Sequence, residues 1–498
     1  MVRWDFLLTA QALESWPGRG PLVARLGALI GSEIRRGRLR PGDRLPGTRT
    51  LADTLGVNRN SVVAAYEELR AEGWVEPRPA GGTFVSERLP DLVPARFTER
   101  AQPGLPARPG FEFSSEFSAF AAGVGTHEAS SIRYALFGGI PDLRLLPVAE
   151  LGRAYRRALR APGRRELDYA KPYGLERLRQ AVAEFLNARR GLAVSADNVL
   201  ITRGSQMALD LVSRLLVRPG DRVAVEEVGY QPAWAALRIA GARLTRIPID
   251  DQGIDLEKLR AALRGGLRAV YVTPHHQYPT TAVLSAARRM ELLTLAAEKK
   301  LVIIEDDYDH EFHYDGRPLM PLASADGTGN VVYIGTLSKI LAPGLRLGFA
   351  VAPAALIQAL AELRSVVDRQ GDQVTERAVA ELLEDGILLR HARRMRRAYR
   401  SRRDALAAAL RRELGDDLEF SVPAGGMALW ARLSRGDARA WGERAQKRGV
   451  VFASGDAYLG PDATAAERRH YRRFLRLGFA RYDERELAAA VRLMAEAL

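Results

Sequence analysis

Short apolar runs that alternate with helical patterns are the feature that most constrains the fold of this chain. Six such runs fall between residues 198 and 352: NVLIT, RVAVEE, LRAVYVT, LVIIEDD, VVYIGT and RLGFAVA. Helical patterns follow three of them, over 205–216, 233–241 and 287–300. Runs this apolar are typical of strands buried on both faces, which occur in parallel sheets covered by helices. The alternation predicts an α/β domain with a mostly parallel sheet.

The amino-terminal residues follow a different pattern. Apolar residues at three- and four-residue intervals predict a helix over 19–36. Thr48 and Asn58 stand where they can cap two further short helices, which glycines end at 56 and 73. Apolar pairs on both sides of the turn PRPAGG then predict a β-hairpin. The order is that of a helix-turn-helix followed by a wing.

The second helix of this motif carries the candidate DNA contacts. Arg59, Asn60 and Ser61 fall in its first turn, where a recognition helix presents side chains to bases and phosphates, and Arg49 falls in the first turn of the preceding helix. Spacing alone leaves open a small helical domain without DNA contacts.

Composition narrows the functional classes. The chain has 498 residues, no cysteine and a net charge of +14. Disulfides, cysteine-ligated metals and thiol nucleophiles are therefore excluded, and the charge favours anionic partners such as nucleic acid. No apolar stretch is long enough for a membrane span, so we expect a cytoplasmic protein without membrane contacts. Only six of the 74 basic residues are lysines, which makes a lysine at a chemically apt place informative.

Lys339 occupies such a place. It follows the apolar run VVYIGT, and an amine that is partly desolvated near cationic groups has a lowered pKa and can form a Schiff base with an aldehyde. Thr336, Ser338 and Arg346 offer two hydroxyls and a guanidinium for a phosphate group. A solvated turn lysine is the alternative that this motif leaves open.

A second run, EDDYDHEFHYD, ends a buried strand in carboxylates, which need a partner there. A pyridinium nitrogen would be such a partner for Asp306, and Tyr308 on the same side would serve the ring hydroxyl. A metal site is the alternative, formed by Asp306, Asp309, His310, Glu311 and His313. Because these side chains would point in different directions, we expect no metal.

Three weaker signals add to this picture. Ser205 and Gln206 follow Gly204 at a helix start, where backbone amides bind phosphate well. Tyr230 stands where it can stack on an aromatic cofactor, and Arg476 can bind a carboxylate with two hydrogen bonds. A core tyrosine and a surface arginine are the alternatives.

The motifs resemble two known families. GRLRPGDRLPGTRTLADTLGVNRNSVVAAYEELRAEGWVEPRPAGGTFV resembles the winged helix-turn-helix of GntR-type transcription regulators. ALFGGIPD, GLERLRQAVAEFLNARRG, TRGSQMALDL, TPHHQYPT, EDDYDHEF and GTLSKILAPGLRLGF resemble fold-type I pyridoxal-phosphate (PLP) enzymes of the class I and II aminotransferase family. The combination is similar to the MocR subgroup of bacterial regulators. It implies a winged-helix domain at 19–88, a linker with five prolines at 89–110, and a PLP-binding domain with a smaller terminal subdomain at 130–498.

The resemblance also implies roles for individual residues. Lys339 would form the internal aldimine, Asp306 would pair with the pyridine nitrogen, and Tyr308 would contact the 3-hydroxyl. His276 or Gln277 also lies near the position of the family's contact to this hydroxyl. Phosphate would be held by Ser205, Gln206, Thr336, Ser338 and Arg346. Tyr230 would stack on the ring and Arg476 would bind a substrate carboxylate. DNA would be contacted by Arg49, Arg59, Asn60, Ser61 and, at the wing tip, Gly82.

Such a protein would be a homodimer that binds double-stranded promoter DNA and senses an amino compound or PLP itself. The alternative is a working aminotransferase with an accessory DNA-binding module, because the residues for transamination are all present. A helix with eight arginines at 390–403 remains ambiguous. It is either a solvated helix, with Met395, Ala398 and Tyr399 as its contacts, or a basic surface that supports bent DNA.

Overall fold

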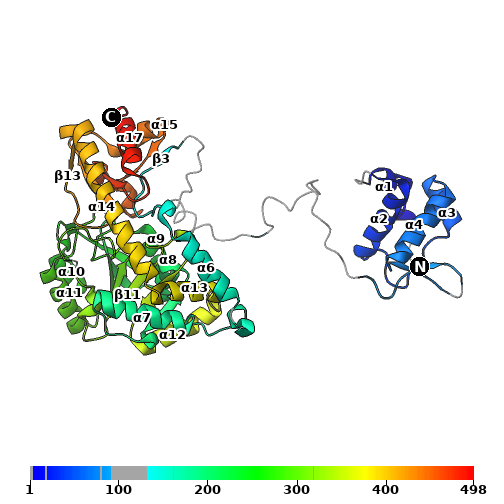
Figure 1. Cartoon of the computed structure of the whole chain (residues 1–498), viewed down its shortest axis with the longest axis horizontal. Coiled ribbons are helices and arrows are strands. Elements are labelled where there is room, and N and C mark those ends of the chain that lie inside the picture. Colours follow the sequence, from blue (N-terminus) through cyan, green and yellow to red (C-terminus); the bar gives the residue numbers. More distant parts are fainter. Residues whose placement is uncertain are drawn as a thin grey trace. The chain divides into compact units, whose positions relative to one another are not determined.

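The computed structural model describes residues 4–16, 20–78, 81–90, 111, 132–160, 162–317 and 319–498. The chain divides into two compact units, Met1–Glu112 and Phe113–Leu498, and Figure 1 labels the elements of each. Apart from residues 89 and 90, the expected linker lies outside the described residues. Among the described residues, no helix is both long and apolar enough to span a membrane.

The first unit is a winged helix-turn-helix, as its sequence predicts. Its elements are η1 (Trp4–Phe6), α1 (Ala10–Glu14), α2 (Leu22–Arg35), α3 (Thr48–Leu55), α4 (Arg59–Ala71), β1 (Val75–Pro77) and β2 (Thr83–Val85). Helices α2 and α4 pack around Ile30, Val62 and Leu69, and β1 pairs antiparallel with β2 to form the wing. The structure also packs Leu8 and Leu13 into this core, so residues ahead of 19 belong to it.

Asn58 caps α4 as expected, since its side chain accepts a hydrogen bond from the backbone N–H of Asn60. The expectation for Thr48 is wrong. Helix α3 begins at Thr48 itself, and Gly47 takes the N-cap position without a side chain to cap the helix.

A seven-stranded sheet forms the centre of the second unit. Its strands are β4 (Val199–Thr202), β5 (Arg222–Glu226), β6 (Arg243–Ile247), β9 (Ala269–Val272), β10 (Val302–Asp307), β11 (Val331–Thr336) and β12 (Gly348–Val351). They lie in the order β4-β12-β11-β10-β9-β5-β6, and only β12 runs antiparallel to its neighbours. The predicted mostly parallel sheet is therefore confirmed.

Helices cover both faces of this sheet. They are α6 (Val148–Leu159), α7 (Glu176–Arg190), α8 (Gly204–Leu216), α9 (Gln231–Ile239), α10 (Leu256–Leu263), α11 (Ala286–Lys299), α12 (Ala354–Val367) and α13 (Gln373–Glu384). Along β4, Leu200 faces one core cluster and Ile201 faces the other. Burial on both faces explains why the strand sequences are almost wholly apolar.

A smaller subdomain contains most of the carboxy-terminal residues. Its sheet has the order β13 (Leu418–Phe420), β14 (Ala428–Leu433), β17 (Phe474–Gly478), β16 (Ala453–Ser454). The helices beside it are α14 (Ile387–Leu414), α15 (Ala438–Lys447), α16 (Ala465–Tyr471) and α17 (Glu484–Ala495). Two short strand pairings lie outside the two larger sheets: β15 (Val450–Val451) pairs with β3 (Tyr134–Ala135), and β7 (Ile249–Asp250) pairs with β8 (Gly253–Ile254) after β6. Figure 1 shows α14 extending from the helices around the large sheet to this subdomain.

The arginine-rich stretch lies in α14. Met395 and Tyr399 are buried as expected, and most of the arginines are exposed. Arg402 and Arg403 differ, because both are buried and form ion pairs with Asp142 and Asp315. The stretch is therefore only partly a solvated face.

Candidate functional site

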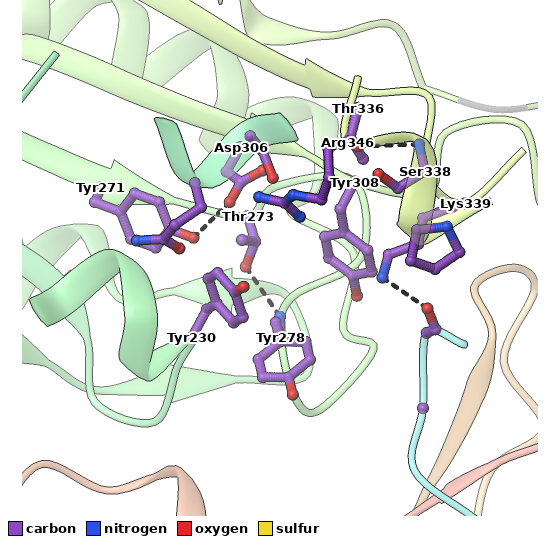
Figure 2. A pocket seen from close by; sticks show the side chains of 15 residues that line it. Tyr230, Tyr271, Thr273, Tyr278, Asp306, Tyr308, Thr336, Ser338, Lys339 and Arg346 are labelled. Atoms are coloured by element: carbon purple, nitrogen blue, oxygen red, sulfur yellow. Dashed lines mark hydrogen bonds between the residues drawn. The ribbon is translucent and has the colours of Figure 1, made fainter. Parts of the chain in front are cut away.

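A cavity of about 200 Å³ lies at the carboxyl ends of the parallel strands, where open α/β sheets bind ligands (Figure 2). Six separate segments of the chain line it. They bring together all nine residues that the sequence analysis assigns to a cofactor: Ser205, Gln206, Tyr230, Asp306, Tyr308, Thr336, Ser338, Lys339 and Arg346. Polar groups that converge on one cavity are typical of a cofactor site.

Lys339 follows β11 and points into this cavity, so it is not a solvated turn lysine. Its Nζ donates a hydrogen bond of 2.6 Å to the carbonyl oxygen of Gly139 (Figure 2). Burial, with the nearby Arg476, lowers the pKa of Lys339 to about 8. A larger fraction of its amine is therefore neutral, and hence nucleophilic, than in an ordinary lysine.

Asp306 stands at the end of β10 and is 4% exposed. Its Oδ2 accepts a hydrogen bond of 2.8 Å from the hydroxyl of Tyr271, whereas its Oδ1 has no partner. Burial raises the pKa of Asp306 to about 7. A cationic N–H placed opposite Oδ1 would stabilise the carboxylate, and the protonated nitrogen of a pyridine ring is such a group.

Two tyrosines stand on the walls of the cavity. The hydroxyl of Tyr308 donates to the carbonyl oxygen of His276 at 3.1 Å, and burial keeps its pKa well above the ordinary value. Tyr230 precedes α9 and packs edge-on against Tyr278, with 5.6 Å between ring centroids. Tyr230 therefore lines the cavity and is only partly buried, unlike a core tyrosine.

A further group of lining residues offers donors for a phosphate group. Ser205 and Gln206 are in the first turn of α8, and Thr336 and Ser338 follow on from β11. Arg346 lies beside them, where its Nη2 donates to the carbonyl oxygen of Arg203 at 3.0 Å. A helix start, hydroxyls and a guanidinium together form a suitable anion site.

Arg476 comes from β17 of the smaller subdomain and is 1% exposed, so the interpretation as a surface arginine is wrong. Its guanidinium lies 4.5 Å from the ring centroid of Tyr278, and its Nε donates to the carbonyl oxygen of Pro279. Both Nη atoms are buried without a partner. Gly138 makes room for them, since a Cβ there would collide with Nη1. Two free donors of one guanidinium fit a carboxylate.

Several lining residues escaped the sequence analysis, among them Tyr271, Thr273 and Tyr278. Tyr271 was detectable in principle, because a tyrosine inside a buried strand needs a partner for its hydroxyl. The side chains of His276 and Gln277 do not line the cavity. The ring of His276 bonds Asp309, and the amide nitrogen of Gln277 donates to the carbonyl oxygen of Val228.

The five candidate metal ligands from the run EDDYDHEFHYD do not converge. Asp306 faces the cavity, Glu311 pairs with Arg190, and Asp309 bonds His276. His310, Glu311 and His313 line a second cavity instead, so the five side chains do not all face one site.

In the first unit, the candidate DNA contacts lie on neighbouring helix starts and on the wing. Arg49, Arg59 and Asn60 are exposed and Ser61 is partly exposed. The Nε of Arg59 donates to the hydroxyl of Thr48 at 3.4 Å, which links the starts of α3 and α4. Gly82 stands in the hairpin with a φ of +118°, beside the exposed Arg44, which the sequence analysis did not select.

Comparison with known families agrees with this architecture. Residues 141–493 match the family of aminotransferases of class I and II, and residues 22–85 match the bacterial regulatory proteins of the gntR family. The chain belongs to the aminotransferase class I and II family and, through its first unit, to the gntR-family transcription regulators.

Its relatives include proteins with both domains. It is 34% identical to the probable rhizopine catabolism regulatory protein MocR of Rhizobium meliloti, over 87% of this chain and 86% of that protein. It is 33% identical to the transcriptional regulator TauR of Rhodobacter capsulatus, over 97% of each chain. The MocR-type combination expected from the sequence is confirmed.

Solved structures match the second domain. The α-aminoadipate aminotransferase LysN of Thermus thermophilus, complexed with N-(5'-phosphopyridoxyl)-L-leucine, superposes with a TM-score of 0.67 at 33% identity, over 76% of this chain and 97% of that one. The kynurenine aminotransferase of Pyrococcus horikoshii, in complex with PMP, gives a TM-score of 0.68 at 30% identity, over 78% and 95%. The fold is that of a fold-type I aminotransferase.

Proposed function

We propose that this gntR-family regulator binds PLP in its aminotransferase-like domain and senses there an amino compound, or PLP itself. The observation that carries the proposal is the joining of a complete cofactor pocket to a DNA-binding domain. The regulators TauR and MocR match 97% and 87% of the chain, whereas the 2-aminoadipate transaminase of Thermus thermophilus matches 76%. The full-length similarity is thus to regulators.

The pocket residues define how PLP would be held. Lys339 would supply the amine, the free Oδ1 of Asp306 would accept from the ring nitrogen, and Tyr308 would contact the ring hydroxyl. Tyr230 would stack on the ring, and Ser205, Gln206, Thr336, Ser338 and Arg346 would hold the phosphate. When bound, PLP supplies an aldehyde that combines reversibly with amines and a ring that withdraws electrons.

Arg476 is the proposed contact for the effector. Its two unpaired Nη atoms are buried near Lys339, so a molecule with an amino group and one carboxylate fits between them. The two Nη atoms belong to one guanidinium, and this favours a single carboxylate. Binding that stabilises one conformation of the domain would change the affinity for DNA by linkage.

On the DNA side, we assign base contacts to Arg59 and Asn60, phosphate contacts to Arg49 and Ser61, and the minor groove to Gly82. We propose that the protein acts in the cytoplasm as a homodimer formed by the aminotransferase-like domains. Two-fold symmetric dimers are the commonest assemblies and match two half-sites in DNA. Sedimentation of the full chain at micromolar concentration as a dimer supports this assignment, and a monomer contradicts it.

The two arginines should differ in what they contribute to DNA binding. Arg49→Ala should weaken binding to all duplexes alike and reduce the salt slope by about one ion. Arg59→Ala should lose about 1–3 kcal/mol of preference for the cognate site. Fluorescence anisotropy at several salt concentrations, with cognate and scrambled duplexes, measures both effects. Arg70→Ala, an exposed change at the far end of α4, is the matched control. Equal losses on both duplexes for Arg59→Ala would contradict its assignment.

Catalytic turnover distinguishes the proposed regulator from a working aminotransferase. The distinction needs an experiment, because the residues expected to bind PLP in either protein line the pocket. A regulator gains nothing from consuming its signal, so spectral changes with amino acids should occur without ordinary turnover. Steady-state assays with panels of amino and keto acids test this expectation. Transamination at about 1 s⁻¹ or faster would establish the enzyme instead.

A further inference from the structure

Four of the seven histidines of the chain lie together next to the cofactor pocket. His275 and His276 follow β9, and His310 and His313 follow β10, the strand next to it. His275 stacks on His310 with 4.4 Å between ring centroids, and its ring centroid lies 4.5 Å from that of His276. The pairing of β9 with β10 thus brings two separate histidine pairs into one cluster.

Most ring nitrogens of this cluster have no hydrogen-bond partner. Both nitrogens of His275 and of His313 are buried and unpaired, and so is Nε2 of His276. The residues His275 and His276 are only 4% and 1% exposed. Buried polar atoms without partners are rare in folded proteins, and each needs an explanation such as a bound ion. Five unpaired nitrogens in one cluster therefore point to a ligand with an affinity for imidazole.

The three rings that carry the unpaired nitrogens also converge. One ring nitrogen each of His275, His276 and His313 lies within 4.8 Å of the other two. Gly425 stands close to Nε2 of His276, where a Cβ would lie only 2.3 Å from this nitrogen, so a residue with a side chain would collide with the ring.

Carboxylates stand behind two of the rings. Oδ1 of Asp309 lies 2.7 Å from Nδ1 of His276, and Oδ2 of Asp307 lies 2.9 Å from Nδ1 of His310. A carboxylate bonded to the far nitrogen of a histidine orients the ring and makes the other nitrogen a better ligand, an arrangement that recurs around protein-bound zinc. Here it leaves Nε2 of His276 facing the cluster.

We propose that His275, His276 and His313 bind a divalent transition-metal ion, for which Zn²⁺ is the best match. Three imidazoles satisfy a tetrahedral zinc with one position left for water, whereas Mg²⁺ and Ca²⁺ require oxygen ligands. His313 is partly exposed and lines, with His310 and Glu311, a second cavity of about 80 Å³. This set differs from the one that the run EDDYDHEFHYD suggests, because two ligands come from the segment after β9.

The ion would also fix a part of the cofactor pocket. The carbonyl oxygen of His276 accepts the hydrogen bond from Tyr308, so a metal on the ring of His276 restrains the backbone that positions this hydroxyl. The metal site itself depends on no assumption about PLP.

Calorimetric titration of the full-length chain, without an affinity tag and freed of metal with EDTA, tests the proposal with Zn²⁺ as the probe. We expect one zinc ion per chain with a micromolar or lower Kd. His275→Gln and His313→Gln should each raise the Kd by at least about tenfold, since even partners behind metal ligands contribute this much. His470→Gln, on α16 outside the cluster, is the matched control and should leave the Kd unchanged.

Two measurements keep the result unambiguous. Far-UV circular dichroism confirms that each variant is folded, and because His313 is only partly buried, its replacement should preserve the fold. Zinc binding should persist in Lys339→Ala, which separates this site from the cofactor pocket. The proposal is overturned by the absence of saturable binding, by a Kd that both histidine variants leave unchanged, or by loss of binding in Lys339→Ala.

Discussion

Replacing Lys339 with alanine is expected to abolish covalent attachment of PLP, and with it the yellow colour of the purified protein. Lys339 is the one lysine among the described residues that line the cavity, and no other side chain there supplies an amine. Borohydride reduction of the wild-type protein should fix the cofactor on the peptide that contains Lys339, as peptide mass mapping can show. Lys258→Ala, an exposed change on α10, is the matched control and should retain the colour.

The same lysine predicts a pH dependence of cofactor loading. Only the neutral amine attacks an aldehyde, and burial lowers the pKa of Lys339 to about 8. The loading rate of the apo protein should therefore rise about tenfold per pH unit below this value and level off above it. A rate that keeps rising toward pH 10, as for an ordinary lysine, would contradict this environment. An unchanged absorbance band in Lys339→Ala would refute the assignment itself.

Arg476→Ala should abolish the spectral response to amino acids and leave PLP attached. The variant removes the buried guanidinium whose two Nη atoms are unpaired, and loss of one partner of a buried ion pair costs about 2–5 kcal/mol of binding. At the lower bound, this loss raises the amino-acid concentration that gives a half-maximal spectral response about thirtyfold. Titration of the visible absorbance with a panel of amino acids measures the change.

Two further variants sharpen this experiment. Arg476→Lys keeps the charge but loses the two-pronged contact, so its response should fall between those of Arg476→Ala and the wild type. Arg435→Ala, an exposed change in the same subdomain, should respond as the wild type does. If Arg476→Ala responds normally, the effector either has no carboxylate or is held by another residue.

The sheet was predictable where the strands are apolar and buried on both faces. All six predicted runs are strands. Strand β6 was missed because its sequence, RLTRI, has only two apolar residues and lies at the sheet edge, where one side is open to solvent. The antiparallel direction of β12 could not be predicted from its apolar sequence, because the burial of a strand does not determine its direction.

Some residues of the candidate site could be predicted from the sequence and others could not. Residues at strand ends and helix starts, such as Asp306, Lys339 and Ser205, were predictable because position and residue type together indicate a chemistry. Thr273 and Tyr278 were not, because their roles depend on which strands and loops become neighbours. The burial of Arg402, which pairs with Asp142 across 260 positions of sequence, likewise needs the tertiary fold.

The affinity of the PLP-loaded full chain for a cognate duplex, selected from a randomised pool, tests the central claim most directly. Fluorescence anisotropy would measure this affinity with and without a saturating amino acid that changes the visible spectrum. The account predicts a shift of at least about fivefold in the wild type, as expected for coupled sites, and no shift in Arg476→Ala, whose affinity without the amino acid is preserved. An unchanged affinity in the wild type, with the spectrum showing the pocket occupied, would contradict the claim that this domain controls DNA binding.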